Sequence, residues 1–225
     1  HWGRKNIEKE LGDMTGLPVK AGNDANVAAL GEMWKGGGQG AKNLILATLG
    51  TGVGGGIIIN EKIVTGAHGA GGEIGHAAVN PHETVACNCG NKGCLEQYAS
   101  ATGIANLANK ALEASEEASV LRGRNNITAK DVFDAYKEGD VLAGKVVAKF
   151  AGYLGRALSV FSCVVDPDVI VLGGGVSKAG QILIDCVEKE FKEHAFKGCK
   201  DTPIKLATLG NDAGIYGAAK LILSK

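Results

Sequence analysis

Residues 44–60 read LILATLGTGVGGGIIIN, two apolar runs joined by a glycine-rich turn. The runs 44–49 and 57–60 have the length and the aliphatic content of buried strands. The backbone N–H groups of the turn can hold phosphate oxygens, and Thr51 adds a hydroxyl. The turn is no Walker A loop, because no Gly-Lys-Ser/Thr follows and the next element is a strand. The stretch predicts a two-stranded unit whose tip can face a phosphate group.

Strands and helices alternate on both sides of this unit. We predict strands over 17–21, 169–172 and 204–208. We predict helices over 6–15, 27–34, 141–163, 180–193 and 214–223, and a helical pattern from 99 to 150 interrupted near 115–126. Run 169–172 has no polar residue, which is typical of a strand covered on both faces. The alternation predicts an α/β fold.

Composition excludes several classes of function. Lys plus Arg and Asp plus Glu both number 24, so the formal net charge is zero and a nucleic-acid surface is not expected. No apolar run of membrane-spanning length and no secretory leader stands out, so we expect a reducing, cytoplasmic location without a membrane partner. The 35 glycines gather at 36–40, 50–56, 66–75 and 173–175, which indicates places where the backbone closely approaches another group.

A short loop carries three of the six cysteines: Cys87, Cys89 and Cys94. Three thiolates in a glycine-spaced loop favour a structural zinc site over three free buried cysteines or a redox pair. A tetrahedral site needs a fourth ligand, for which His76 is the upstream candidate. His68 and His82 are rival ligands.

Two further motifs are ambiguous when taken alone. Asn23 and Asp24 precede the helix predicted over 27–34, and such a pair commonly serves as an N-cap. Gly173, Gly174 and Gly175 follow the strand predicted over 169–172, where open α/β sheets bind ligands, although glycines there also simply permit close packing.

Taken together and in this order, the motifs resemble the ROK family (repressors, open reading frames and sugar kinases), and most closely its glucokinases from Gram-positive bacteria. The loop matches C-x-C-G-x-x-G-C-x-E from Cys87 to Glu96, and residues 73–76 match E-x-G-H. Residues 23–26 match N-D-A-N, while 50–52 and 173–175 match the phosphate and adenosine segments. The resemblance covers essentially all 225 residues.

The resemblance implies a role for each matching residue. Asp24 would be the general base that deprotonates the 6-hydroxyl of the sugar. The sugar ring would be bound by Asn23, Glu73, His76 and Glu96. The nucleotide would be bound by Thr51, Gly52, Gly173, Gly174 and Gly175. Zinc would be held by His76, Cys87, Cys89 and Cys94, as a clamp that places the sugar-binding side chains. ATP and Mg²⁺ would complete the reaction.

The resemblance also implies an actin-like ATPase, ribonuclease H-like large lobe with a zinc-binding insert, spanning residues 1–225. The D-x-G-G-T phosphate loop with which the family's kinases begin has no counterpart here. We therefore expect this chain alone to be inactive or nearly so. We also expect the helix over 214–223, with its stripe of Ile215, Ala218, Ala219 and Ile222, to be displaced, disordered or buried against a second copy, as a homodimer or other self-association.

Three alternatives to glucose phosphorylation stay open. The chain could phosphorylate another hexose, such as fructose, mannose or N-acetylmannosamine. It could belong to a sugar-responsive ROK transcriptional regulator, which carries the same cysteine motif. It could also be a non-catalytic carbohydrate-binding or assembly module.

Overall fold

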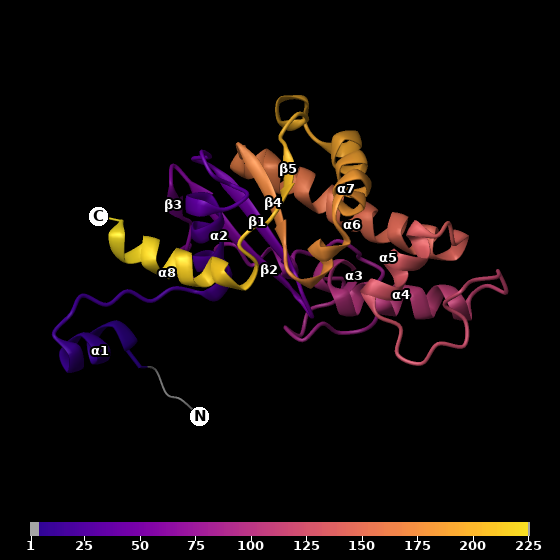
Figure 1. Ribbon diagram of the computed structural model, residues 1–225, viewed down its shortest axis with the longest axis horizontal. Helices are drawn as coiled ribbons and strands as arrows, with labels where there is room; N and C mark the ends of the chain where they lie inside the picture. Colours follow the sequence, from indigo (N-terminus) through magenta and orange to yellow (C-terminus); the bar gives the residue numbers. More distant parts are fainter. Residues whose placement is uncertain (1–4, 225) are drawn as a thin grey trace.

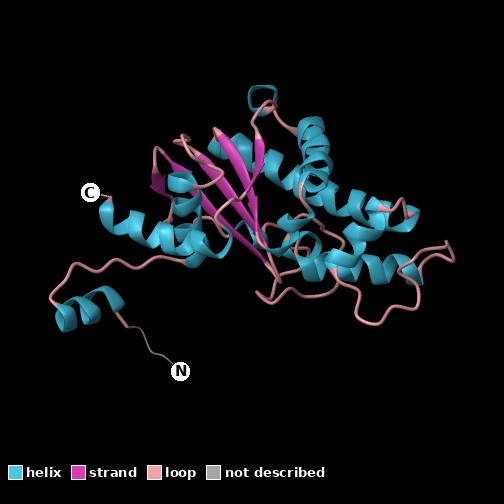
Figure 2. Cartoon of the chain, in the orientation of Figure 1, coloured by secondary structure: helices cyan, strands magenta, loops and turns pink. Residues whose placement is uncertain are grey.

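The computed structural model describes residues 5–224, and its centre is a five-stranded mixed sheet between two layers of helices (Figures 1 and 2). The strand order is β3-β2-β1-β4-β5. The strands are β1 (Leu44–Leu49), β2 (Val53–Ile59), β3 (Lys62–Ile63), β4 (Val169–Gly173) and β5 (Ile204–Leu206). β1 pairs antiparallel with β2 and parallel with β4, so the predicted hairpin supplies two of the five strands.

Strand β2 begins four residues earlier than the apolar run predicted. Gly54, Gly55 and Gly56 belong to the strand and pair with β1. A Cβ atom at Gly56 would lie 2.5 Å from the Ala29 side chain of the helix packed above it. The glycines are strand residues because they make room for that helix, although glycine has a low strand propensity.

Alternate residues of the central strands divide the core into two clusters. Ile45 and Leu49 of β1 join Leu172 of β4 in the larger cluster. Leu44 and Leu46 face the opposite side of the sheet. This period of two, with apolar residues on both faces, confirms the prediction of a sheet covered on both sides.

Five helices cover the larger cluster. They are α3 (Glu96–Ala99), α4 (Ala101–Glu113), α5 (Ala129–Lys137), α6 (Val141–Val165) and α7 (Gln181–His194). Helix α5 begins at a capping box, in which Thr128 and Asp131 exchange hydrogen bonds with each other's backbone N–H groups. The helical pattern predicted from 99 to 150 is confirmed, with its interruption between α4 and α5.

Helix α6 is the one described helix that is long and apolar enough to cross a membrane, by length and composition alone. That finding corrects the expectation that no segment reaches this length. Of its most apolar stretch, 56% is buried inside the protein. Its residues Phe150, Leu154 and Leu158 are fully buried in the larger cluster, as in a core helix.

Helices α2 (Asp24–Lys35) and α8 (Ala213–Leu223) lie on the other face of the sheet. They cross closely, because Cβ atoms at Gly31 and Gly217 would each lie about 2 Å from a backbone oxygen of the other helix. Helix α8 is thus ordered and packed on its own chain, so the expectation of a displaced or disordered helix was wrong. It packs through Ala213, Gly217 and Leu221, and the stripe that includes Ile215 and Ile222 faces solvent.

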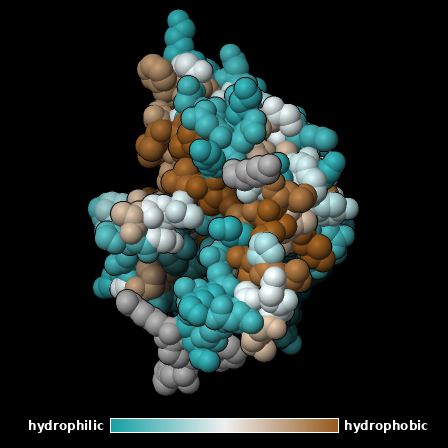
Figure 3. Space-filling model, turned by 90° about the vertical axis from the view of Figure 1, so that its left-hand side faces the viewer, coloured by the Kyte–Doolittle hydropathy of each residue, from teal (hydrophilic) through white to brown (hydrophobic). Residues whose placement is uncertain are grey.

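Helix α1 (Ile7–Thr15) lies apart from the sheet, with Asn6 as its N-cap and no buried residue (Figure 1). The strand predicted over 17–21 does not form, because no other described strand lies beside it to complete its hydrogen bonds. Figure 3 views the end of the molecule where α1 and α8 lie, and hydrophobic surface gathers near the middle of that face.

Candidate active site

The N-terminus of α2 presents Asn23 and Asp24 at the surface. The Asn23 side chain is the N-cap, since its Oδ1 accepts hydrogen bonds from the N–H groups of Ala25 (3.0 Å) and Asn26 (3.2 Å). Asn23 is therefore the N-cap of α2, as predicted, and its Nδ2 group takes no part in the cap. Asp24 is exposed, and its Oδ1 accepts a hydrogen bond from the backbone N–H of Ala25 at 2.8 Å.

A cavity of about 480 Å³ joins Asp24 to the tip of the β1–β2 hairpin. Its lining includes Asp24, Thr51, Gly52, Glu96 and Gly174. Four separate segments therefore converge on one space. The segments are the start of α2, the hairpin tip, the start of α3 and the end of β4. The family resemblance assigns all five residues to the site, and the structure brings them together around this cavity.

Gly52 is required by the position of Glu96. A Cβ atom at residue 52 would lie 2.0 Å from Oε2 of Glu96. The same Oε2 accepts a hydrogen bond from the backbone N–H of Val53, at 3.1 Å. The Glu96 carboxylate thereby holds the turn in place. Residue 52 is a glycine because the carboxylate lies so close to it.

The sequence-predicted metal ligands form one cluster. The donor atoms of His76, Cys87, Cys89 and Cys94 all lie within 4.8 Å of one another. Cys89 Sγ lies 3.6 Å from Cys94 Sγ, and Cys87 Sγ lies 3.9 Å from Nδ1 of His76. Two sulfurs on one tetrahedral zinc, with Zn–S bonds of about 2.3 Å, lie about 3.8 Å apart. The four donors therefore fit a zinc ion, and all six cysteines of the chain are free thiols.

The chemistry of the donors also suits a cation. Burial raises the pKa of the Cys94 thiol to about 12, and burial also raises the pKa of Cys87. The backbone N–H of Asn91 lowers the pKa of the exposed Cys89. Buried thiols of this kind ionise when they coordinate a metal, whose charge replaces the lost hydration.

His76 is the last residue of the short helix η1 (Ile74–His76), and Glu73 is the residue before that helix. This helix lies against β2, because a Cβ at Gly75 would lie 2.0 Å from the carbonyl oxygen of Val53. His76 is half-buried beside Cys87, whereas Glu73 is exposed. Glu73 does not line the cavity of Asp24, and its carboxylate forms no hydrogen bond with any other described residue. The structure therefore does not place this side chain in the site.

Two further cavities lie near the carboxyl end of β4. One, of about 410 Å³, is lined in part by Thr48, Gly173, Gly174 and Gly175. It contains Gly174, as does the cavity of Asp24. The other, of about 350 Å³, contains Gly175 and lies between α5 and η2 (Gly175–Ala179). Neighbouring cavities share lining residues, since Gly174 lines the first two and Gly175 lines the last two.

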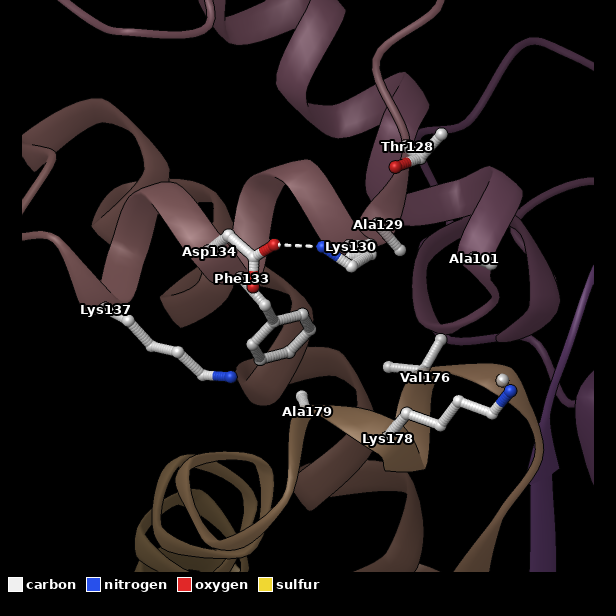
Figure 4. A pocket seen from close by; sticks show the side chains of 11 residues that line it. Ala101, Thr128, Ala129, Lys130, Phe133, Asp134, Lys137, Val176, Lys178 and Ala179 are labelled. Atoms are coloured by element: carbon white, nitrogen blue, oxygen red, sulfur yellow. Dashed lines mark hydrogen bonds and ion pairs between the residues drawn. The ribbon is translucent and has the colours of Figure 1, made fainter. Parts of the chain in front are cut away.

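The last of these cavities has an apolar wall and a cationic edge (Figure 4). The Phe133 ring and Val176 face each other across it, and Lys137 and Lys178 extend along it. Lys130 is bound to Asp134 at 2.5 Å. The sequence did not single out these residues, because those in α5 have the spacing of any amphipathic helix and those in η2 come near them only in the fold.

Comparison with known proteins gives a consistent result. Residues 1–225 match the model of the ROK family. A glucokinase of Halalkalibacterium halodurans is 47% identical over 96% of this chain and 67% of its own length. An N-acetyl-D-glucosamine kinase of Histophilus somni is 33% identical over 98% of this chain and 72% of its own.

Solved structures are similar over the same range. A ROK family glucokinase from Streptomyces griseus, in complex with glucose and AMPPNP, has a TM-score of 0.83 at 36% identity, over 98% of this chain and 73% of that one. A ROK family transcriptional regulator, a homolog of the E. coli MLC protein, has the same TM-score at 31% identity, over 95% of this chain and 54% of the regulator.

Proposed function

Because the chain belongs to the ROK family, we propose that it is the sugar- and nucleotide-binding part of a hexokinase of the glucokinase type, a phosphotransferase with an alcohol acceptor. The reaction transfers the γ-phosphate of ATP to the 6-hydroxyl of glucose in the cytoplasm. The fold is then the large lobe of an actin-like ATPase, and residues 1–225 form one functional unit.

The observation that carries this proposal is the shared cavity. Asp24 lies in the same space of about 480 Å³ as the hairpin tip of Thr51 and Gly52 and the β4 end at Gly174. Phosphoryl transfer depends on holding the acceptor oxygen and the γ-phosphate in line. A carboxylate and two glycine-rich turns around one space supply the components for that alignment.

In the proposed mechanism, Asp24 accepts the proton of the sugar 6-hydroxyl as its oxygen attacks the γ-phosphorus. The bond from that phosphorus to the β–γ bridging oxygen breaks, and ADP leaves. Thr51 and the backbone N–H groups near Gly52 stabilise the transferred phosphoryl oxygens. Mg²⁺ bound with ATP would neutralise part of the developing charge.

The proposed sugar-binding set is Asn23, Glu73, His76 and Glu96; Glu96 lines the cavity of Asp24, and the other three are assigned by the motif match alone. Carboxylates suit a polyol, because each accepts hydrogen bonds from neighbouring hydroxyls. Zinc held by His76, Cys87, Cys89 and Cys94 would fix the His76 ring and the loop before Glu96, and would take no part in the chemistry. Gly173, Gly174 and Gly175 approach the nucleotide, and the cavity of Phe133 and Val176 suits its flat, apolar base.

The binding preference of the chain tests the substrate. We expect glucose to bind more tightly than fructose, mannose, N-acetylmannosamine or N-acetylglucosamine, measured by titration calorimetry on one preparation. Tighter binding of an N-acetylated sugar would move the assignment to the kinases of those sugars, which are also among the relatives. Binding of no hexose at millimolar concentration would contradict the proposal.

A sugar-responsive regulator is the second candidate, because a ROK regulator has a TM-score of 0.83 with this chain. Nucleotide binding separates the two candidates. The kinase requires that ATP or ADP bind along the glycine turns. Sugar binding without measurable nucleotide binding would favour the regulator or a non-catalytic carbohydrate-binding module.

A further inference from the structure

Glu32, in the last turn of α2, is the one charged side chain buried among the described residues, with 1% of its surface exposed. The reaction proposed above assigns it no role. Burying a carboxylate is costly unless its charge is compensated by hydrogen bonds or an ion pair. Its partners therefore indicate what its position achieves.

The compensation comes entirely from backbone N–H groups. Oε2 accepts hydrogen bonds from Gly37 (2.8 Å) and Thr208 (3.1 Å), and Oε1 accepts one from Leu209 (2.9 Å). Within residues 5–224, Glu32 forms no ion pair with a lysine or an arginine. One carboxylate thus joins the end of α2 to a segment 176 residues later in the chain.

Two glycines of the patch at 36–40 are explained by close approaches at this point. A Cβ atom at Gly36 would lie 2.0 Å from Oε2 of Glu32. A Cβ at Gly37 would lie 2.4 Å from the carbonyl oxygen of Leu206 in β5. The chain after α2 therefore folds over the carboxylate and against β5 only because these residues lack side chains.

The segment that Glu32 holds leads directly into the proposed active site. Thr208 and Leu209 precede η4 (Gly210–Asp212), and Gly210 and Asn211 line the cavity that contains Asp24. Glu32 itself lines the adjoining cavity, together with Gly174 and Lys178. Asp24 and Glu32 lie at the two ends of the same helix, about 12 Å apart along its axis.

We propose that Glu32 is a positioning residue for the nucleotide side of the site. By holding Thr208 and Leu209, it fixes Gly210 and Asn211 at a set distance from Asp24 and from Gly174 across the cavity. Helix α2, which carries Asp24, thereby also fixes Gly210 and Asn211, the part of the cavity wall along which the nucleotide lies. We call the three hydrogen bonds that Glu32 accepts from Gly37, Thr208 and Leu209 the clamp. This inference rests on the proposed function only for the identity of the ligand, because the clamp is present in the free protein.

The first experiment measures the clamp without any ligand. In Glu32→Gln the side chain keeps its size, but its NH₂ group must face at least one N–H donor, whichever way the amide turns. We expect amide hydrogen exchange at Thr208 and Leu209 to accelerate at least about ten-fold relative to the unsubstituted chain. Val187→Ala, a buried change in α7, is the control for lost stability. Equal exchange at 208 and 209 in the two variants would overturn the proposal.

The second experiment separates positioning from general loss of structure. We expect Glu32→Gln to weaken ADP binding about ten-fold and to change glucose binding less than about two-fold. Gly36→Ala, which displaces the carboxylate without removing its charge, should reproduce this split. Unchanged ADP binding, or an equal loss for both ligands, would overturn the positioning role. If the unsubstituted chain bound no ADP, the proposed function would fail, and the exchange experiment would still decide the clamp.

Discussion

The Glu96 carboxylate connects the hairpin tip to the cysteine cluster: Oε2 accepts the backbone N–H of Val53 at 3.1 Å, and Oε1 lies 3.4 Å from Cys87 Sγ. One side chain therefore contacts both the hairpin tip and the candidate metal centre. The same side chain lines the cavity of Asp24. The first prediction concerns this residue.

Glu96→Gln should weaken glucose binding by about ten-fold or more, because the amide cannot accept from Val53 and also accept from a sugar hydroxyl with the strength of a carboxylate. Calorimetric titration measures the affinity. Glu113→Gln, near the exposed end of α4, is the matched control and should bind glucose normally. Normal glucose affinity in both variants would remove Glu96 from the sugar site.

The candidate metal centre predicts about one zinc per chain in fresh, reduced protein, by elemental analysis. Cys94→Ser should lose most of that zinc and lower the melting temperature, because Cys94 is fully buried within the cluster. Cys163→Ser, at an exposed cysteine outside the cluster, should keep both. Zinc-free protein with an unchanged melting temperature would show that the cluster is three free thiols and a histidine.

Asp24→Asn should lower turnover by about two to four orders of magnitude in the gene product that carries this chain, with glucose affinity nearly unchanged. The asparagine can still bind a hydroxyl, but it cannot take its proton. Asp13→Asn, at an exposed position in α1, serves as the control for loss of one carboxylate. Turnover close to normal would reduce Asp24 to the first residue of a helix.

The structure predicts an acid-sensitive contact beside the loop of the cluster. The hydroxyl of Tyr98 donates to Glu83 at 2.6 Å, and this bond is the main reason that the pKa of Glu83 falls from 4.5 to about 2. The contribution to stability is complete above pH 4.5 and is lost as the pH falls from 4.5 to about 2, since the unfolded chain then binds the proton more readily.

Tyr98→Phe should therefore be less stable than the unsubstituted chain by about 1–3 kcal/mol at pH 6, and the difference should shrink below pH 4.5. Denaturant unfolding at several pH values measures it. The phenylalanine keeps the stacking on Tyr153, whose ring centroid lies 4.1 Å away, so the lost hydroxyl is the main change. A difference that is constant between pH 6 and pH 3 would contradict this account.

Local patterns in the sequence predicted most of the sheet and the cysteine cluster. Two of these patterns are local: the apolar runs of β1 and β4, and the spacing of Cys87, Cys89 and Cys94. Each lies within a short segment, so the structure that it predicts depends little on the rest of the chain. Glu32 is different, because its meaning depends on Thr208 and Leu209, which only the complete fold brings near. The cavity of Phe133 and Val176 also forms between distant segments, so no local pattern reveals it.

The last prediction concerns the exposed stripe of α8. Ile215 is 70% exposed and Ile222 is 43% exposed, with Ala218 and Ala219 between them on the surface. The helix is held on α2 by its opposite face, so the stripe is presented on an ordered support. Exposed apolar surface of this kind favours association with another surface.

We therefore expect this chain to self-associate at micromolar concentration, and Ile215→Glu to shift it towards the monomer in sedimentation velocity. Val164→Glu, at an 81% exposed valine of α6, is the matched control and should leave the association unchanged. The charge is tolerated at both sites because each side chain already faces water. A monomer at all concentrations before substitution would show that the stripe is no interface between copies, and an equal effect of the two substitutions would place the interface elsewhere.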